Sequence, residues 1–536
     1  MKKRTSMMLA VVLGLCLVLA ACSGGNNGNG GNGGNGGNTN GAGNDNAVNA
    51  GSGNTGGENA GSGEPLKEQT FTFLNYSNPS WPYNEDWPVW DFIKENTGVT
   101  LDVQLPSGNL LEDAVSLAIA SGEMPDLMWI QTKAAADKFG QQGALVNLLD
   151  YVDQMPNFKA WMEEYPAETQ HMISADGKMY MTPNGGIGET NRRTWMYRED
   201  VFTELGLQTP STWDELYEVL QTLKAEYPDS YPLTFRSGLR NFLDFGAGFG
   251  VPAPVEVAKA SVLFDQASEQ WIYAPVQDDY MKMLEYFNKF YKEELIPKDF
   301  LTIDTKMWQD IVSTDRAFIT LDYIGRIDFF NSALRADNPA FSMNFMPPPA
   351  GWAGGPQENA YTAVSEEGFM IASTSDKIDD IVRFLDFFYS EEGRQMVSWG
   401  KEGETYEGDA FIADYADVAD LRKQTGLSTD GTYAWFDYDA HISVSSPELK
   451  TAYEQAPQYD SEKPVSVAFT PDEQQIISTK GDALNSHRDE NFAKFIMGTR
   501  SFDEWGAFIE EQKKLGYEEI LGIYKAAHER ALAAVQ

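Results

Sequence analysis

The sequence predicts an α/β protein with room for two domains. Short runs of strand-forming residues alternate with amphipathic helical patterns, which is typical of a mostly parallel, Rossmann-like sheet. About 470 of the 536 residues follow a low-complexity N-terminal region, and 12% of all residues are aromatic, so the chain can bury two cores. The cysteines are Cys16 and Cys22, both near the N-terminus, so we expect no disulfide in the body of the protein.

The body begins with a predicted βαβαβ unit. Its strands are expected at residues 71–75, 100–105 and 126–130. A helix over 85–96 and a second helix around 111–119 lie between them, and Gly98 and Gly122 end these helices. Strands that alternate with helices in this way favour a parallel sheet.

Further elements follow the same alternation. Thr212 and Glu215 have the spacing of a capping box at the start of a helix. Helices are predicted over 278–295, 378–388 and the last forty residues, and strands over 317–322, 342–346 and 367–371.

The N-terminus predicts export and lipid anchoring. Three basic residues precede an apolar run over 7–21, which is too short to span a membrane and has the length of a signal-peptide core. The run ends in Leu-Ala-Ala-Cys22, which resembles the lipobox of bacterial lipoproteins. We therefore expect residues 1–21 to be removed and Cys22 to be lipidated, placing the protein on the extracellular face of the cell membrane of a Gram-positive bacterium. The alternative is an ordinary secretory signal that happens to contain a cysteine.

Residues 22–64 are predicted to be a disordered tether. They are mostly Gly, Asn and Ser, which cannot bury apolar surface. About forty such residues reach roughly 35–40 Å on average. A protein that must stay near a membrane can use this length to sample its surroundings.

Charge excludes several partners. The formal net charge is −40, and it becomes more negative once residues 1–21, with three basic and no acidic residues, are removed. Such a field repels nucleic acid and anionic lipid, so the lipid anchor is the expected membrane contact. No apolar run after the signal is long enough for a transmembrane helix.

Several motifs together resemble the family 1 extracellular solute-binding proteins. Residues 121–126 (Ser-Gly-Glu-Met-Pro-Asp) are similar to a conserved turn of that family, and 176–183 to one of its strands. Residues 195–216 and 390–393 match further family segments in the same order. Residues 399–406 are similar to a stretch of the large oligosaccharide-binding lipoproteins.

The resemblance implies a two-lobed, periplasmic-binding-protein-like (type II) α/β fold. The chain would cross the hinge three times, and the solute would lie in the cleft between the lobes. Carried over to this sequence, lobe one spans 68–185 and 342–402, and lobe two spans 190–340 and 403–536. The implied function is a monomeric receptor that captures an oligosaccharide and delivers it to the permease subunits of an ABC importer. No cofactor is implied. Residues 224–234 lack the calcium-binding loop of larger members, so we expect no calcium there.

Aromatic and polar residues near strand ends are the candidate ligand contacts, because sugars offer polar rims and apolar C–H faces. Burial in the core is the alternative for Trp81, Tyr83 and Trp435, and a surface role is the alternative for Arg192. The resemblance supports Tyr323 and Arg326, and Asn184 and Arg192 flank the predicted crossing between lobes. The candidates are Trp81, Tyr83, Asn184, Arg192, Arg236, Asn241, Tyr323, Arg326, Trp352 and Trp435.

Two other classes of function compete with a receptor. The four histidines form no H-E-x-x-H motif, and the sequence has no G-x-S-x-G elbow or P-loop. A glycosidase needs just two suitably spaced carboxylates, so eighty acidic residues leave that alternative open. An adhesive surface lipoprotein without transported cargo is the second alternative. For a receptor, a peptide or a small sugar is the alternative ligand.

Overall fold

The computed structural model describes most of the chain beyond residue 65; the predicted signal peptide, Cys22 and the predicted tether lie outside the described residues. The described ranges are 66–78, 81–107, 110–187, 192–251, 261–266, 268–360, 367–465 and 467–535. Within these ranges, no helix combines the length and apolar character needed to cross a bilayer.

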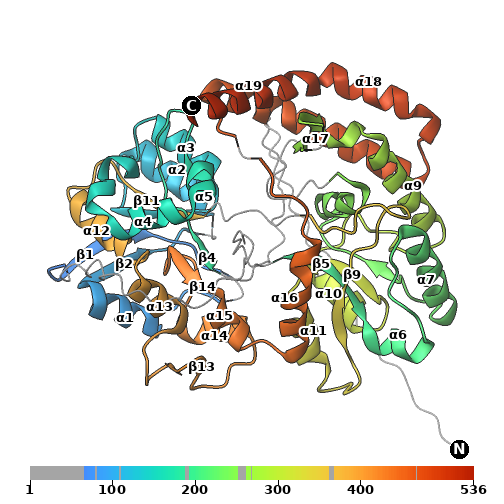
Figure 1. Cartoon of the computed structure of the whole chain (residues 1–536), viewed down its shortest axis with the longest axis horizontal. Helices are drawn as coiled ribbons and strands as arrows, with labels where there is room; N and C mark the ends of the chain where they lie inside the picture. The colour runs from blue at the N-terminus through green and yellow to red at the C-terminus, as the bar shows by residue number, and fades with distance from the viewer. Residues whose placement is uncertain are drawn as a thin grey trace, which may run out of the picture. The chain divides into compact units, whose positions relative to one another are not determined.

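Among the described residues, the first sheet has four strands in the order β11-β3-β1-β2. Figure 1 labels three of them, β1, β2 and β11. β1 (Gln69–Leu74) pairs in parallel with β2 (Val99–Gln104) and β3 (Leu127–Ile130), and β11 (Gly368–Ile371) is antiparallel to β3. α1 (Pro88–Thr97) and α2 (Leu111–Ser121) connect the parallel strands. The predicted βαβαβ unit is confirmed, although α1 begins at Pro88 rather than at residue 85 because proline fits the first turn of a helix.

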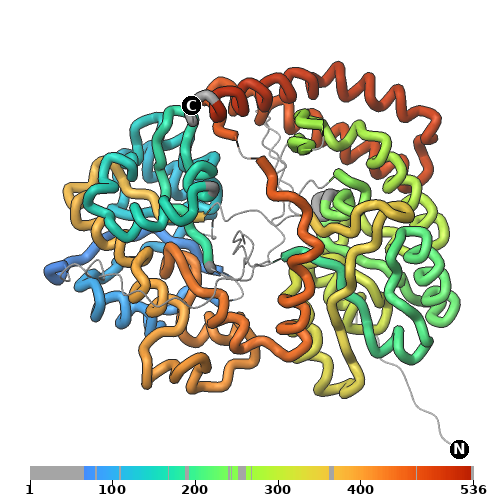
Figure 2. Tube along the Cα trace, viewed as in Figure 1, coloured from blue at the N-terminus to red at the C-terminus, as the bar shows by residue number. Residues whose placement is uncertain are grey.

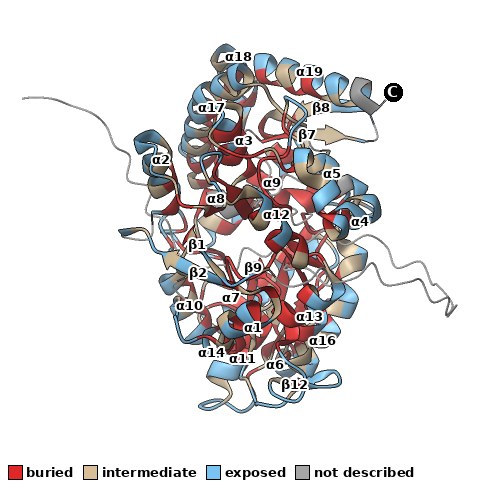
Figure 3. Ribbon diagram, turned by 90° about the vertical axis from the view of Figure 1, so that its left-hand side faces the viewer, coloured by how far each residue is buried: buried red, intermediate tan, exposed pale blue. Residues whose placement is uncertain are grey.

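Aromatic side chains from distant segments form the core of the first sheet. Phe71 of β1 lies 5.7 Å from Phe384, and Phe73 lies 5.5 Å from Phe369, measured between ring centroids. Trp129 of β3 packs edge-on against Phe369 at 5.0 Å. Figure 3 shows many buried residues where the helices pack inward, while the outer turns of the helices carry many of the exposed ones.

The second sheet has the order β10-β5-β9-β6. Its strands are β5 (Arg193–Arg198), β6 (Leu233–Thr234), β9 (Ile319–Tyr323) and β10 (Met343–Met346). Trp213, at the start of α7 (Trp213–Glu226), is fully buried and contacts Phe287 and Phe290 of α9 (Asp278–Lys292). Half of the predicted capping box forms: Thr212 accepts from the Glu215 N–H, but the Glu215 carboxylate binds Ser211 instead.

The remaining elements are short. The helices are α3 (Lys133–Gln141), α4 (Pro156–Glu164), α5 (Pro166–Met172), α6 (Glu199–Leu205), α8 (Leu239–Phe242), α10 (Thr305–Ser313), α11 (Arg326–Leu334), α12 (Ile378–Phe387), α13 (Glu391–Trp399), α14 (Val418–Thr425), α15 (Tyr438–Ser443) and α16 (Pro447–Gln455). Three strand pairs lie outside the two main sheets: β4 (Gly185–Ile187) with β14 (Trp435–Asp437), β7 (Val262–Asp265) with β8 (Gln270–Tyr273), and β12 (Tyr406–Glu407) with β13 (Ala410–Phe411).

The core clusters correct the expected lobe boundaries in two places. β10 was expected in lobe one, but it pairs with β5 and its Met346 belongs to the core of the second sheet. Residues 421–438 were expected in lobe two, but Leu421 and Tyr433 pack in the core of the first sheet. Backbone pairing and apolar packing place β10 in the second sheet, and apolar packing places residues 421–438 with the first.

The chain passes between the two cores three times, as predicted. It leaves the first core after Ile187 and enters the second sheet at Arg193. It returns between Met346 and Gly368, and it leaves again after Tyr438. Near the first crossing, β4 pairs in parallel with β14, and a Cβ on Gly185 would lie 2.8 Å from the Trp435 ring. Glycine is therefore required for this close approach.

The C-terminal helices are α17 (Pro471–Met497), α18 (Trp505–Leu515) and α19 (Tyr517–Val535). α17 lies beside α9, which is nearly two hundred residues earlier in the chain (Figures 1 and 2). The Asn288 amide of α9 donates to the carbonyls of Phe495 and Ile496 at 2.9 and 3.0 Å. The predicted helical face is confirmed, since Trp505 and Phe508 are buried in the second core.

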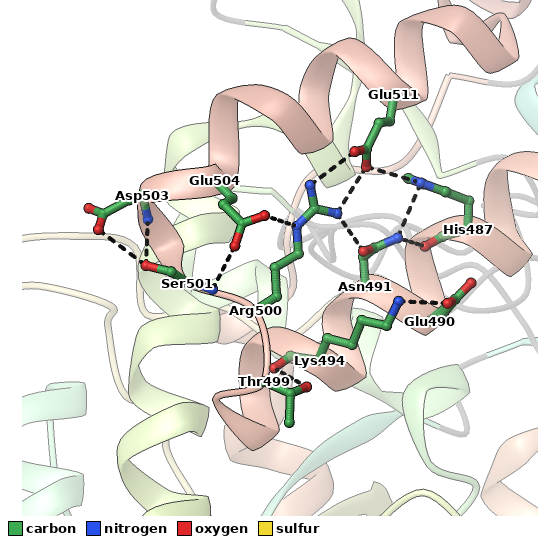
Figure 4. Close-up of polar contacts among 10 residues, drawn as sticks. All are labelled: His487, Glu490, Asn491, Lys494, Thr499, Arg500, Ser501, Asp503, Glu504 and Glu511. Atoms are coloured by element: carbon green, nitrogen blue, oxygen red, sulfur yellow. Dashed lines mark hydrogen bonds and ion pairs between the residues drawn. The ribbon is translucent and has the colours of Figure 1, made fainter.

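Polar contacts fix α18 against α17 (Figure 4). The Arg500 guanidinium lies between the helices and donates to Asn491 Oδ1 and to Glu511 Oε2, the latter at 2.9 Å. His487 stacks on Phe508 and lies 3.2 Å from Glu511. Hydrogen bonding from Arg500 lowers the pKa of Glu511, so the carboxylate stays ionised.

Candidate functional site

Three arginines gather at one edge of the second sheet. Arg193, the first residue of β5, pairs in register with Tyr323, the last residue of β9. Arg236 follows the parallel strand β6, and Arg326 begins α11. This is the carboxyl end of β6 and β9, where open α/β sheets bind ligands. We call Arg193, Arg236, Asp244, Asp322, Tyr323 and Arg326 the arginine cluster.

Asp322 organises the arginine cluster. Its carboxylate accepts from Arg236 Nε at 2.6 Å, from Arg236 Nη2 at 3.0 Å and from Arg326 Nε at 3.2 Å. Burial acts to raise the pKa of Asp322, but the two guanidinium groups outweigh burial and lower the pKa to about 2. The carboxylate is therefore ionised at neutral pH and holds both arginines in place.

Arg193 and Tyr323 form a stacked pair in the same cluster. Arg193 donates to Asp244 Oδ2 at 2.9 Å and to the Tyr323 hydroxyl at 3.1 Å. Its guanidinium carbon lies 4.6 Å from the centroid of the tyrosine ring. Phe329, 37% exposed, extends the aromatic surface beside Arg326. Planar donors next to aromatic rings suit a ligand with hydroxyl groups and apolar faces.

A second cluster lies at the carboxyl end of β1 in the first sheet. Arg422 is fully buried, and its guanidinium carbon lies 4.7 Å from the centroid of the Trp81 ring. Asn75 follows β1 directly and donates to the Asp430 carbonyl at 3.0 Å. Trp81 Nε1 and Asn75 Oδ1 are buried without a hydrogen-bond partner among the described residues. The buried Glu367 side chain shares a hydrogen bond with Asp430. We call Asn75, Trp81, Glu367, Arg422 and Asp430 the tryptophan–arginine cluster.

Burial shifts the pKa values of the charged groups in the tryptophan–arginine cluster. Burial raises the pKa of Asp430, although the positive charge of Arg422 opposes the rise. Burial also lowers the pKa of Arg422. Gly431, with φ of +83°, brings the backbone so close that a Cβ there would lie 2.4 Å from the Asn75 amide. The turn that carries Asp430 therefore requires glycine.

Residues 84–395 match the family model for bacterial extracellular solute-binding proteins, and this match spans more than half of the chain. The chain belongs to this family. The predicted resemblance is confirmed.

Two relatives of this solute-binding protein are similar over most of their length. The polygalacturonan/rhamnogalacturonan-binding protein YtcQ of Bacillus subtilis (strain 168) is 24% identical over 463 residues, which cover 82% of this chain and 87% of YtcQ. The fructooligosaccharide ABC transporter substrate-binding protein FusA of Streptococcus pneumoniae serotype 4 (strain ATCC BAA-334 / TIGR4) is 22% identical over 511 residues, covering 86% and 90%. Both relatives are named as binding proteins rather than enzymes.

A solved structure shares the fold. The crystal structure of the alginate-binding protein AlgQ2 without calcium ion superposes with a TM-score of 0.71 at 22% identity, covering 88% of this chain and 100% of AlgQ2. The two-lobed α/β fold class predicted for this solute-binding protein is thereby confirmed.

The structure brings four of the predicted ligand contacts into the two clusters. Arg236, Tyr323 and Arg326 meet in the arginine cluster, and Trp81 lies in the tryptophan–arginine cluster. Tyr83, next to Trp81 in the sequence, is half-buried and packs against Trp87 and Trp90.

Three other candidates are buried near the crossings. Asn184 donates to the Tyr433 carbonyl at 2.6 Å and accepts from Thr182. Arg192 Nε contacts both carboxylate oxygens of Asp460 at 2.8 Å. Trp435 is 3% exposed and packs edge-on against Trp161 at 5.0 Å. These side chains join parts of the fold. Burial was the alternative for Trp435, whereas the alternative for Arg192 was a surface role, and Arg192 is buried.

The last two candidates are Trp352 and Asn241. Trp352 is 42% exposed, and Lys282 Nζ of α9 lies 5.5 Å from its ring. Asn241 falls in α8, but its side chain lies outside the described residues. The connection from α7 to β6 is held by Lys224, whose Nζ donates to the Ser230 carbonyl at 2.7 Å; the absence of calcium there stays a prediction.

Sequence reasoning missed three of the six residues of the arginine cluster and four of the five residues of the tryptophan–arginine cluster. The missed residues are Arg193, Asp244 and Asp322 in the first cluster, and Asn75, Glu367, Arg422 and Asp430 in the second. Asp322 sits beside Tyr323 at the carboxyl end of β9, so the strand-end rule that selected Tyr323 also pointed to it. Arg193 begins β5 and reaches this edge because β5 runs antiparallel to β9. Arg422 and Asp430 come from a region assigned to the other lobe, so no sequence signal placed them beside Trp81.

Proposed function

We propose that this solute-binding protein captures an oligosaccharide outside the cell and delivers it to an ABC importer. Family membership supports the role of a receptor. The arginine cluster is the observation that supports an oligosaccharide as the ligand. Its guanidinium groups and its aromatic rings offer hydrogen-bond donors and flat apolar faces side by side. Relatives named for polygalacturonan and fructooligosaccharides support the extension to this chain.

The two clusters form the two halves of the proposed ligand site. Tyr323, Arg236 and Arg326 contact the sugar from the second sheet, and Trp81 and Asn75 contact it from the first. A ligand held on both sides favours the closed arrangement, because the open one loses half of its contacts. The importer's permease subunits then distinguish the loaded receptor from the empty one.

The N-terminal region supplies the proposed location. Removal of residues 1–21 leaves Cys22 as the lipidated first residue, and residues 22–64 tether the protein outside the membrane of a Gram-positive cell. The protein acts there as a monomer and carries out no catalysis. Its net negative charge keeps it in solution above the anionic lipid surface.

Thermal shift against oligosaccharides, monosaccharides and peptides tests this function. A ligand present at one hundred times its Kd stabilises the folded state by about 2.7 kcal/mol, which gives a clear rise in Tm. We expect an oligosaccharide to produce a saturable rise that Arg326→Ala abolishes and Trp352→Ala preserves. Recovery of a cleaved sugar would favour a glycosidase, and no shift across the panel would favour an adhesive lipoprotein.

A further inference from the structure

We propose that an ion pair between Glu168 and Lys463 acts as a latch that holds the two lobes together and thereby sets how tightly the receptor keeps its solute. The inference rests on the proposed function, since it concerns regulation of the same ligand site. Lys463 Nζ donates to Glu168 Oε1 at 2.5 Å, although the two residues are almost three hundred positions apart. We call these two residues the latch.

The carboxylate of the latch belongs to the first lobe. Glu168 lies on α5, whose Met172 is buried in the core of the first sheet. Glu168 is itself buried, and burying a carboxylate costs free energy unless the carboxylate is paired with a cation. His171 on the same helix is not that cation at neutral pH, because burial, with smaller contributions from Lys133 and Lys463, lowers the pKa of His171 to about 4. Lys463 is the cation that pairs with Glu168.

The lysine of the latch is held to the second lobe on both sides along the chain. Before Lys463, Asp460 accepts at 2.8 Å from Nε of Arg192, which leads directly into β5. After Lys463, the Phe469 ring packs edge-on against Tyr524 of α19, with 4.8 Å between the ring centroids. α19 packs beside α17, and α17 packs beside α9 of the second core. The segment that carries Lys463 therefore moves with the second lobe.

The latch lies outside the three places where the chain passes between the cores. Those crossings follow Ile187, Met346 and Tyr438, and they join the lobes in every arrangement. A rotation about the crossings that separates the cores draws α5 away from the segment that carries Lys463. A hydrogen bond of 2.5 Å is lost in such a movement, so the latch stabilises only the arrangement in which the lobes are together.

Burial strengthens the latch. The side chains of Glu168 and Lys463 are 6% and 30% exposed, so solvent screens their attraction less than it screens an ion pair on the open surface. The apparent Kd of a receptor equals the Kd of its closed form divided by the fraction of molecules that are closed. Loss of the latch lowers this fraction in the absence of solute and therefore raises the apparent Kd.

A distance measured between the lobes without solute tests the latch directly. The full chain with Cys16→Ser and Cys22→Ser contains no other cysteine, so Lys94→Cys on α1 and Glu218→Cys on α7 can carry one spin label each. Both positions are exposed, and they lie on different lobes. Double electron–electron resonance then gives the distribution of distances between the two labels in the solute-free protein.

Three variants of this labelled protein are compared with the wild-type sequence at the latch. Glu168→Gln and Lys463→Gln remove the same ion pair from opposite sides, so a folding defect confined to one of them is recognised. Glu448→Gln is the matched control, because Glu448 of α16 pairs with Arg335, just after α11, at 2.7 Å within the second lobe. We expect longer distances in both latch variants and an unchanged distribution in the control.

Calorimetric titration of the same proteins with the oligosaccharide that gives the largest thermal shift measures the effect on binding. We expect each latch variant to raise the Kd about fivefold, and the double variant to raise it no further, because either change removes the same ion pair. Unchanged distances in the latch variants would overturn the inference. A higher Kd without longer distances would also overturn it, since Glu168 would then contact the solute itself. If the wild-type protein binds no oligosaccharide, the proposed function fails, and the distance measurement still decides whether the latch holds the lobes together.

Discussion

Asp322 at the edge of the second sheet and Asp430 at the edge of the first are both buried beside arginine, yet their pKa values move in opposite directions. Asp322 contacts two guanidinium groups, which lower its pKa to about 2. Asp430 is buried near Arg422, and burial outweighs that charge and raises its pKa. Burial alone therefore does not fix the state of a carboxylate; the number and geometry of its cationic contacts decide.

The comparison suggests different tasks for the two proposed halves of the site. The arginine cluster is a rigid, ionised network whose donors are oriented before a ligand arrives. The tryptophan–arginine cluster is packed more tightly, with Gly431 against Asn75 and Trp81 against Arg422. We expect the first to be sensitive to loss of charge and the second to be sensitive to added volume.

Removal of the Asp322 carboxylate is expected to have the largest effect. Asp322→Ala leaves the buried Arg236 and the partly buried Arg326 without their shared acceptor, and breaking a buried ion pair typically costs about 3–5 kcal/mol. Denaturant unfolding measures the loss. Asp153→Ala is the control, because Asp153 pairs with Lys159 on the surface and should leave the midpoint unchanged. An equal loss of stability in Asp322→Ala and Asp153→Ala would contradict a rigid network around Asp322.

Added volume at Gly431 is the matching test for the first sheet. Gly431→Ala places a Cβ 2.4 Å from the Asn75 amide at positive φ, whereas Gly408→Ala has positive φ but nothing within 4 Å. Both variants carry the backbone strain, so their difference isolates the clash, which is expected to cost about 1–3 kcal/mol. Thermal unfolding of both proteins gives this difference. A Gly431 variant no less stable than the Gly408 variant would show that the turn yields easily.

The sequence predicted the first sheet more fully than it predicted either cluster. The strands at 71–75, 100–105 and 126–130 were found because their pattern is local, and β1, β2 and β3 follow it. Tyr323 and Arg326 were found because a strand ends beside them. Arg422 was not, because its approach to Trp81 joins residues more than three hundred positions apart. No local periodicity encodes such a contact, and the mistaken assignment of residues 421–438 to lobe two hid it further.

The dependence of stability on pH should reveal that the pKa values of Asp322 and Asp430 are shifted in opposite directions. In the folded protein the pKa of Asp322 is about 2, against an ordinary value of 3.8. At 1.36 kcal/mol per pKa unit, this lowering stabilises the folded state by about 2 kcal/mol. The stabilisation is present above pH 4 and is lost as the pH falls toward 2. Asp430 has a raised pKa, so its contribution to stability declines as pH rises above 3.8. Unfolding free energies between pH 3 and pH 7 test both. Asp322→Asn should weaken the fall of the unfolding free energy at acid pH. Asp430→Asn should remove the fall of the unfolding free energy as the pH rises toward neutral.

The smallest expected effect separates the hydroxyl of Tyr323 from its ring. Tyr323→Phe removes the acceptor for Arg193 Nη2 at 3.1 Å but keeps the ring on which the guanidinium stacks. Losing one such hydrogen bond typically costs about 1 kcal/mol, so unfolding should shift only slightly. Oligosaccharide affinity should weaken less in Tyr323→Phe than in Tyr323→Ala, because the flat apolar face remains. If both variants lose affinity equally in calorimetric titrations, the hydroxyl rather than the ring makes the contact, and stacking is not what this edge of the sheet contributes.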